Sequence, residues 1–286
     1  MLMYNTLRIY GVVRYFLWNS GLPDGAKSAI TILSVAGIMA ISYILGGFNF
    51  AIILSKKKFG TDVREYGSGN AGMTNMRRTF GKKAGTMVLL GDMGKTVVAC
   101  LIGYLFLGRL GAYIAGLFCM MGHMFPAKYK FKGGKGVVCV ATAILMTDIG
   151  NPSVYFIPFL FIILLGIFVV IVLGTKYISL GSIMCMLIYP VFLYSFEFMG
   201  EKAEDIATYQ GNLDLGLYIL IAFLMTAMVV FMHRQNIVRL WRGEESKFDL
   251  HMSDKKALYN EKKDKETAED TPESSDNNSK KSKKKK

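Results

Sequence analysis

Residues that bind metals or form cross-links are scarce in this 286-residue chain. It contains four cysteines and three histidines, and the four cysteines (Cys100, Cys119, Cys139 and Cys185) all lie within apolar runs. No two cysteines form a C-x-x-C pair, and the histidines are scattered along the sequence. We therefore expect no disulfide and no metal site.

Long apolar runs dominate the sequence instead. Hydrophobic residues make up 52% of the chain, the mean hydropathy is +0.34, and seven apolar runs cover about residues 29–55, 84–107, 111–126, 136–147, 153–173, 178–196 and 214–232. A helix needs roughly 20 residues to cross a bilayer, so the third and fourth runs are short, which favours tilted or partly re-entrant segments. The runs do not alternate as barrel strands do. They predict an all-α polytopic membrane protein with about seven transmembrane helices.

Positive charge gathers on one side of the predicted membrane. The connections 56–83, 127–135, 174–177 and 233–245 hold sixteen Lys and Arg, whereas the opposite connections hold two, Arg109 and Lys202. Because basic connections stay inside the cell, this asymmetry predicts that the N-terminus lies outside and the C-terminus in the cytoplasm.

The two ends differ in composition from the apolar region 29–245, which we interpret as one membrane-embedded domain. Residues 1–28 mix Arg8, Arg14 and Lys27 with apolar side chains, and we expect an N-terminal extension that forms an interfacial helix. Residues 246–286 hold twelve Lys and nine Asp or Glu, so we expect a disordered, charged cytoplasmic tail. Its lysine-rich end is either simply solubilising or a binder of anionic lipid headgroups.

Three glycine-rich or basic turns lie on the predicted cytoplasmic side, at residues 67–78, 129–137 and 233–243. Glycines let backbone N–H groups point at an anion, and lysines and arginines supply charge. In the first turn a helix beginning near Thr74 or Asn75 would present its N-terminus to a phosphate, with Arg78 as a clamp. In the third, His233 and Asn236 would share one helix face. Capping, membrane topology and interfacial anchoring are the simpler explanations of these turns.

Two apparent nucleotide motifs are rejected. Gly67-Ser-Gly-Asn-Ala-Gly72 matches G-x-G-x-x-G but lacks the preceding strand that a dinucleotide fold requires, and Gly134-Lys135 is followed by Gly136 instead of Ser or Thr.

Asp92 and Lys95 stand three residues apart inside an apolar run, where ionisable groups are costly. We expect a structural salt bridge between them.

The turns resemble those of a known family. Three segments look like the signatures of the bacterial acyl-phosphate:glycerol-3-phosphate acyltransferases, the PlsY family. They are Gly67-Ser-Gly-Asn-Ala-Gly-Met-Thr-Asn-Met-Arg-Arg78, then Gly122-His-Met-Phe-Pro126 with Phe131-Lys-Gly-Gly-Lys-Gly136, then His233-Arg-Gln-Asn-Ile-Val-Arg-Leu-Trp-Arg-Gly243. Asp92-Met-Gly-Lys95 and Tyr177-Ile-Ser-Leu-Gly-Ser182 also fit. The resemblance runs from about residue 29 to 245, with departures at Met73 and Met232.

The resemblance implies a seven-helix enzyme of the bacterial cell membrane whose active site faces the cytoplasm. It implies transfer of a fatty acyl group from acyl phosphate to the 1-hydroxyl of glycerol 3-phosphate. No cofactor and no nucleic acid would take part, and membrane lipids would surround the enzyme. Either His233 or the substrate's own phosphate would act as the base. The motif match predicts Ser68, Lys135, His233 and Asn236 as catalytic residues, and as substrate or phosphate binders Gly69, Asn70, Gly72, Thr74, Asn75, Arg78, Gly133, Gly134, Gly136, Ser179 and Arg239.

Other functions fit the sequence less well. An organic-phosphate transporter would also need basic cytoplasmic turns, but it usually shows repeated halves, and no repeat is visible here. A lipid phosphotransferase relies on Mg²⁺ held by acidic clusters, whereas the basic connections contain only Asp62, Glu65, Glu244 and Glu245. The H-x-x-x-x-D signature of acyl-CoA-type acyltransferases is absent from the sequence.

Overall fold

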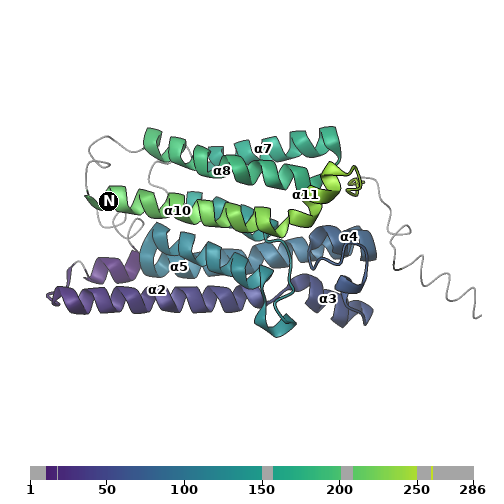
Figure 1. The fold of residues 1–286 in the computed structure, drawn as a ribbon. Helices are drawn as coiled ribbons and strands as arrows, with labels where there is room; N and C mark the ends of the chain where they lie inside the picture. The colour runs from purple at the N-terminus through teal and green to yellow at the C-terminus, as the bar shows by residue number, and fades with distance from the viewer. Residues whose placement is uncertain (1–10, 18, 150–156, 201–208, 250–258, 260–286) are drawn as a thin grey trace, which may run out of the picture.

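The computed structural model describes residues 11–17, 19–149, 157–200, 209–249 and 259. Every regular element in this part of the chain is helical, as predicted, and the long helices run along a common axis (Figure 1). The elements are α2 Asp24–Gly47, α3 Phe50–Phe59, η1 Val63–Glu65, α4 Met73–Phe80, α5 Lys82–Met124, η2 Ala127–Tyr129, α6 Val137–Ile149, α7 Ile157–Thr175, α8 Ile178–Gly200, α10 Tyr209–Met232 and α11 Arg234–Trp241.

Helix α5 is in fact two antiparallel helices. Its backbone leaves helical geometry at Leu107 and at Gly108, whose φ of 61° favours glycine. Lys95 Nζ and His123 Nδ1 lie 3.0 Å apart, although 28 residues of straight helix would separate them by about 42 Å. The two halves pack so closely that a Cβ atom on Gly103 would lie 2.1 Å from the carbonyl oxygen of Gly111. The second and third apolar runs are therefore the two arms of this hairpin.

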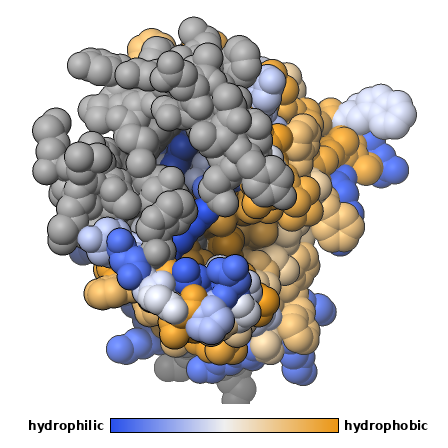
Figure 2. All heavy atoms as spheres, turned by 90° about the vertical axis from the view of Figure 1, so that its left-hand side faces the viewer, coloured by the Kyte–Doolittle hydropathy of each residue, from blue (hydrophilic) through white to orange (hydrophobic). Residues whose placement is uncertain are grey.

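Membrane character is visible in length, composition and exposure. Four described segments are long and apolar enough to cross a bilayer, namely Asp24–Phe59, Lys82–Tyr129, Ile178–Glu197 and Leu213–Met232, and α6 and α7 are shorter apolar helices. Large apolar side chains such as Ile32, Leu33 and Val170 are exposed. Apolar side chains also cover a flank of the bundle when it is viewed along its axis (Figure 2). The protein is an integral membrane protein, whereas the exact number of spans and their orientation stay predictions.

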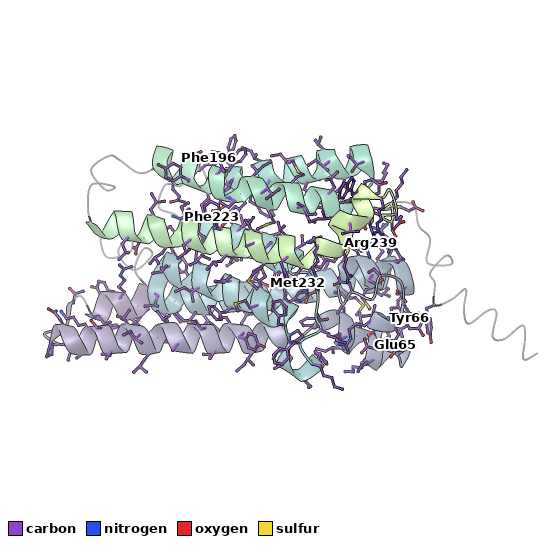
Figure 3. The ribbon with its side chains drawn as sticks, in the orientation of Figure 1. Glu65, Tyr66, Phe196, Phe223, Met232 and Arg239 are labelled. Carbon is purple, nitrogen blue, oxygen red and sulfur yellow. The ribbon has the colours of Figure 1, made fainter. Side chains whose placement is uncertain are left out.

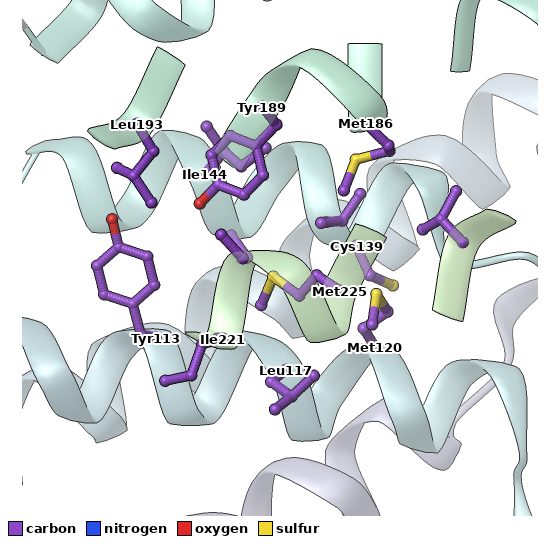
Figure 4. Packing of buried hydrophobic residues seen from close by; sticks show 14 of the residues in the cluster. Tyr113, Leu117, Met120, Cys139, Ile144, Met186, Tyr189, Leu193, Ile221 and Met225 are labelled. Carbon is purple, nitrogen blue, oxygen red and sulfur yellow. The ribbon is translucent and has the colours of Figure 1, made fainter. Parts of the chain in front are cut away.

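The core joins α5, α6, α7, α8 and α10. At its centre Leu117, Met120, Cys139, Ile144 and Met225 pack together (Figure 4). Helix α2 packs along α5, where Gly46 and Gly122 permit close approach, and much of α2 is exposed.

The two ends of the bundle are organised differently. The short helices α3, α4 and α11 gather at one end, together with Tyr66 and Arg239, whereas Phe196 lies at the other (Figure 3). At that other end the buried Arg109 donates to both carboxylate oxygens of Glu197 and so fastens α5 to α8.

Only part of the predicted extensions falls within the described residues. Residues 11–17 are helical, Gly11 packs against the backbone of Phe106 and Gly108, and Arg14 pairs with Asp214 at 3.2 Å. This segment therefore lies at the end of the bundle that holds the α5 reversal. Residues 1–10 and most of the predicted tail 246–286 lie outside the described residues, so the interfacial and disordered states stay predictions.

Candidate active site

The three turns singled out in the sequence meet at one cavity. The cavity has a volume of about 730 Å³ and lies at the end of the bundle that carries α3, α4 and α11. Its polar end is lined by side chains from residues 67–78, from Lys135 and from α11, and an apolar arm extends between α6, α7 and α8. Residues separated by more than 150 positions thus share one site, as the sequence predicted.

The first turn is held open by Asn75. The side chain of Asn75 is buried; its Oδ1 accepts from the Ser68 N–H at 3.0 Å, and its Nδ2 donates to the carbonyl oxygens of Val63 and Tyr66. Gly67 has a φ of 57°, and a Cβ atom there would lie 2.3 Å from Asn75 Oδ1. The amide of Asn75 is therefore committed to the shape of the loop, which positions Ser68 at the cavity.

Helix α4 follows this loop. It begins at Met73, with Gly72 as the N-cap, one or two residues before the predicted start at Thr74 or Asn75. Thr74 and Arg78 both line the cavity, and they stand four residues apart, so they lie on the same face of the helix. A hydroxyl near the helix N-terminus and a guanidinium one turn later suit an anion held between them.

The second turn rests on a buried cluster of charges. Lys95 Nζ lies 2.8 Å from Asp92 Oδ1 and 3.0 Å from His123 Nδ1, which confirms the predicted Asp92–Lys95 salt bridge. His123 supports the turn directly, because a Cβ atom on Gly134 would lie 2.1 Å from its Nε2 and one on Gly133 would lie 2.0 Å from its carbonyl oxygen. These two glycines therefore serve close packing against His123, and they leave Lys135 aimed at the cavity.

The third turn brings a carboxylate into the polar end. Lys135 Nζ donates to Asn236 Oδ1 at 2.5 Å, and Asn236 Nδ2 donates to Glu245 Oε1 at 2.6 Å. Ser179 Oγ donates to the same Glu245 oxygen at 2.7 Å, and Arg239 Nε donates to Glu245 Oε2 at 2.9 Å. Glu245 thus ties the segment after α11 to α8 and fixes the orientation of Asn236 and Arg239.

Burial sets the protonation of two groups in the cavity. Burial lowers the pKa of Lys135 to about 8, and the nearby Arg239 and Arg78 lower it while Glu245 raises it. Burial and the charge of Lys135 lower the pKa of His233 to about 4. The neutral imidazole of His233 donates from Nδ1 to the Val229 carbonyl oxygen at 2.8 Å, so its Nε2 is left as a hydrogen-bond acceptor.

The carboxylate of Glu245 stays ionised in this setting. Its burial by itself raises the pKa, but the hydrogen bonds from Ser179, Arg239 and Asn236 outweigh burial and lower it.

Most of the predicted site residues line the cavity. They are Ser68, Asn70, Gly72, Thr74, Asn75, Arg78, Lys135, Gly136, Ser179, His233, Asn236 and Arg239. The predicted binders Gly69, Gly133 and Gly134 are not among its lining residues. In the part of the chain that the structure describes, no three His, Cys, Asp or Glu side chains gather in a way that could bind a metal ion.

Sequence reasoning missed Glu245. In the sequence it is one of only four acids in the basic connections, and their small number argued only against an acidic cluster that binds Mg²⁺. The available signal was its position, two residues after Gly243 at the end of the third turn, where two acids, Glu244 and Glu245, follow a run of basic side chains.

Comparison with known proteins agrees with the cavity and its motifs. The family model described as glycerol-3-phosphate acyltransferase matches residues 36–243. The glycerol-3-phosphate acyltransferase of Exiguobacterium sibiricum is 35% identical over 78% of this chain and 98% of its own length, and that of Clostridioides difficile is 35% identical over 76% and 96%. The chain belongs to the glycerol-3-phosphate acyltransferase family.

Solved structures extend the likeness to the fold of this acyltransferase. The crystal structure of PlsY, an integral membrane glycerol 3-phosphate acyltransferase, in its glycerol 3-phosphate form, superposes with a TM-score of 0.62 at 29% identity. It covers 76% of this chain and 96% of the other chain. The lysophosphatidic acid form of PlsY gives a TM-score of 0.60 at 28% identity. The helices that build the cavity thus belong to a fold shared with a solved acyltransferase.

Proposed function

We propose that this enzyme transfers a fatty acyl group from acyl phosphate to the 1-hydroxyl of glycerol 3-phosphate, giving 1-acyl-glycerol 3-phosphate and phosphate. The single observation that carries this proposal is the shape of the cavity. One end is cationic and polar, which suits two phosphate-bearing groups, and the other is an apolar arm that suits an acyl chain. The names of the solved PlsY forms, with glycerol 3-phosphate and with lysophosphatidic acid, agree with this acceptor and product.

The polar end divides naturally into two parts. Ser68, Thr74, Arg78 and Lys135 offer hydroxyls and positive charge, and Lys135 meets Glu245 only through Asn236, so we assign the phosphate groups to this part. Holding two mutually repelling phosphates together is the main task, because an acyl phosphate is already an activated mixed anhydride. The ammonium of Lys135 and the guanidinium of Arg78 also stabilise the oxyanion of the tetrahedral intermediate.

His233 has the right tautomer to receive the attacking hydroxyl. Its Nε2 accepts a hydrogen bond from the 1-hydroxyl of glycerol 3-phosphate, while Asn236 is held beside it by Lys135 and Glu245. A pKa of about 4 makes His233 a weak base. We therefore assign it the orientation of the bound hydroxyl; as the hydroxyl attacks, its single proton leaves the hydrogen bond to Nε2 and passes to a phosphate oxygen. A bond forms between the hydroxyl oxygen and the acyl carbon as the bond from that carbon to the phosphate oxygen breaks.

We place this chemistry at the cytoplasmic face of the bacterial cell membrane. The proposal assigns one span to each of the seven apolar runs, with the N-terminus outside. Two features support it: the excess of Lys and Arg in the connections at the cavity end, and the reversal within α5, which gives each arm its own crossing.

A donor assay with purified protein tests the reaction. Labelled glycerol 3-phosphate should be acylated by palmitoyl phosphate and not by palmitoyl-CoA, and a chelator should leave the rate unchanged. Transfer from the CoA thioester at a comparable rate would reject acyl phosphate as the distinguishing donor.

A further inference from the structure

The apolar arm of the cavity has a defined depth. Helix α7 lines it on one face with Val172, Phe168, Leu164 and Phe161, which recur at helical spacing from the polar end inward. Leu165 lines the same arm and is 47% exposed, so the arm also opens sideways toward the apolar flank of the bundle. A chain that enters there comes from the membrane.

The arm ends blind. The deepest lining residues are Ile144 and Leu145 on α6, Phe161 on α7 and Met186 on α8, each about two to three turns from the polar end. Beyond them the core is closed, because Tyr189 and Leu193 are 1% and 0% exposed. Figure 4 shows Ile144 packed beside Tyr189, with Leu193 farther along the bundle, and neither Tyr189 nor Leu193 lines the cavity.

The depth of the arm can be read from α7. Eleven residues separate Phe161 from Val172, which corresponds to about 16 Å of helix. An extended acyl chain with C–C bonds of about 1.5 Å advances roughly 1.25 Å per methylene. The arm therefore holds about a dozen methylenes between the level of Val172 and its closed end, plus the few carbons nearest the carbonyl.

We propose that the ring of Phe161, at the blind end of the arm, determines the longest acyl chain that this enzyme transfers efficiently. This inference rests on the proposed acyl phosphate donor and adds the residue that sets its chain length. Phe161 suits the role because, unlike Ile144 and Met186 at the same closed end, it is only partly buried, so its ring can be removed with less disturbance of the packed core.

The test compares kcat/KM for saturated acyl phosphates of about twelve to about twenty carbons in three variants and the wild type. Phe161→Ala frees room for about three methylenes. Phe159→Ala is the matched control, because Phe159 lies on the same helix, is 55% exposed and does not line the cavity. Ala141→Phe tests the opposite direction, because Ala141 lines the arm about one turn nearer the mouth than Ile144.

Each added methylene that finds room is worth about fourfold in binding. We expect Phe161→Ala to raise the ratio of the longest to the middle chain by about tenfold or more, and Ala141→Phe to shift the optimum about four carbons shorter. Phe159→Ala should keep the wild-type profile. If Phe161→Ala does not accumulate, Phe161→Leu takes its place in the same comparison. An unchanged profile in the Phe161 variant would overturn the proposal even if Ala141→Phe shifts the optimum, whereas failure of the wild type with every acyl phosphate would overturn the donor itself.

Discussion

Replacing Glu245 by Gln tests whether this carboxylate keeps Lys135 charged in the cavity. Lys135 Nζ reaches Asn236 at 2.5 Å, and Asn236 reaches Glu245 at 2.6 Å, so one amide bridges the two charges. At about 7 Å and an effective dielectric constant of about 20, their attraction is about 2.4 kcal/mol. Partial exposure and the pairing of Glu245 with Arg239 reduce this, so we expect a shift of about one pKa unit at Lys135.

The sign of the effect follows from which form binds substrate. Lys135 must be protonated to hold a phosphate, so its contribution is present below its pKa of about 8 and is lost above it. Removing Glu245 removes the charge that raises this pKa, so the alkaline limb of kcat/KM should move from about pH 8 to about pH 7. The variant should be about fivefold less active than wild type at pH 8 and nearly equal to it at pH 6.

The assay is kcat/KM for glycerol 3-phosphate from pH 5.5 to 9.5, with thermal unfolding in detergent as the check on folding. Glu244→Gln is the matched control, since Glu244 is the neighbouring residue, is exposed and does not line the cavity. Alkaline limbs that coincide in wild type and Glu245→Gln would refute the electrostatic role of Glu245 and leave it a purely structural anchor.

Two further predictions concern charge against geometry and the role of the tail. Arg78→Lys keeps the charge but removes the guanidinium with its two donors, so we expect activity to fall about tenfold or more. Lys128→Arg, at an exposed position outside the cavity, should keep activity within about twofold of wild type. Equal losses in matched, membrane-inserted protein would mean that the basic turns act only as a diffuse electrostatic surface. Deleting residues 250–286 should leave activity within about twofold, because the cavity is complete by Phe248. Loss of most activity in a well-folded truncated enzyme would make the tail part of the site.

The sequence by itself determined the class of the protein and the composition of its polar site. Apolar runs of sufficient length can satisfy their backbone in lipid only as helices, so the all-α membrane class follows from hydropathy alone. The three turns were also visible, because glycines and basic residues at short spacing are local features. Ser68, Arg78, Lys135, His233 and Asn236 were all predicted, and all line the cavity.

The roles of individual residues within the turns depended on contacts between distant segments. Asn75 was predicted to bind substrate, but its amide is hydrogen-bonded to Val63, Tyr66 and Ser68. Gly133 and Gly134 were predicted to cradle an anion, and they pack against His123. The sequence cannot distinguish a glycine that approaches a phosphate from one that packs against a neighbouring helix, because both positions need only the absence of a Cβ atom.

Only the tertiary structure decided where the arms of the site end and which charges face each other. The reversal at Gly108 folds α5 back on itself and brings Asp92 and Lys95 to His123, a contact that hydropathy cannot indicate because both arms are apolar. The chain turn after α11 carries Glu245 back to Ser179 on α8, across 66 residues of sequence. The apolar arm stops where Phe161 and Ile144 meet the closed core at Tyr189, because side-chain packing between helices, and not the pattern of any single helix, fixes where a cavity ends.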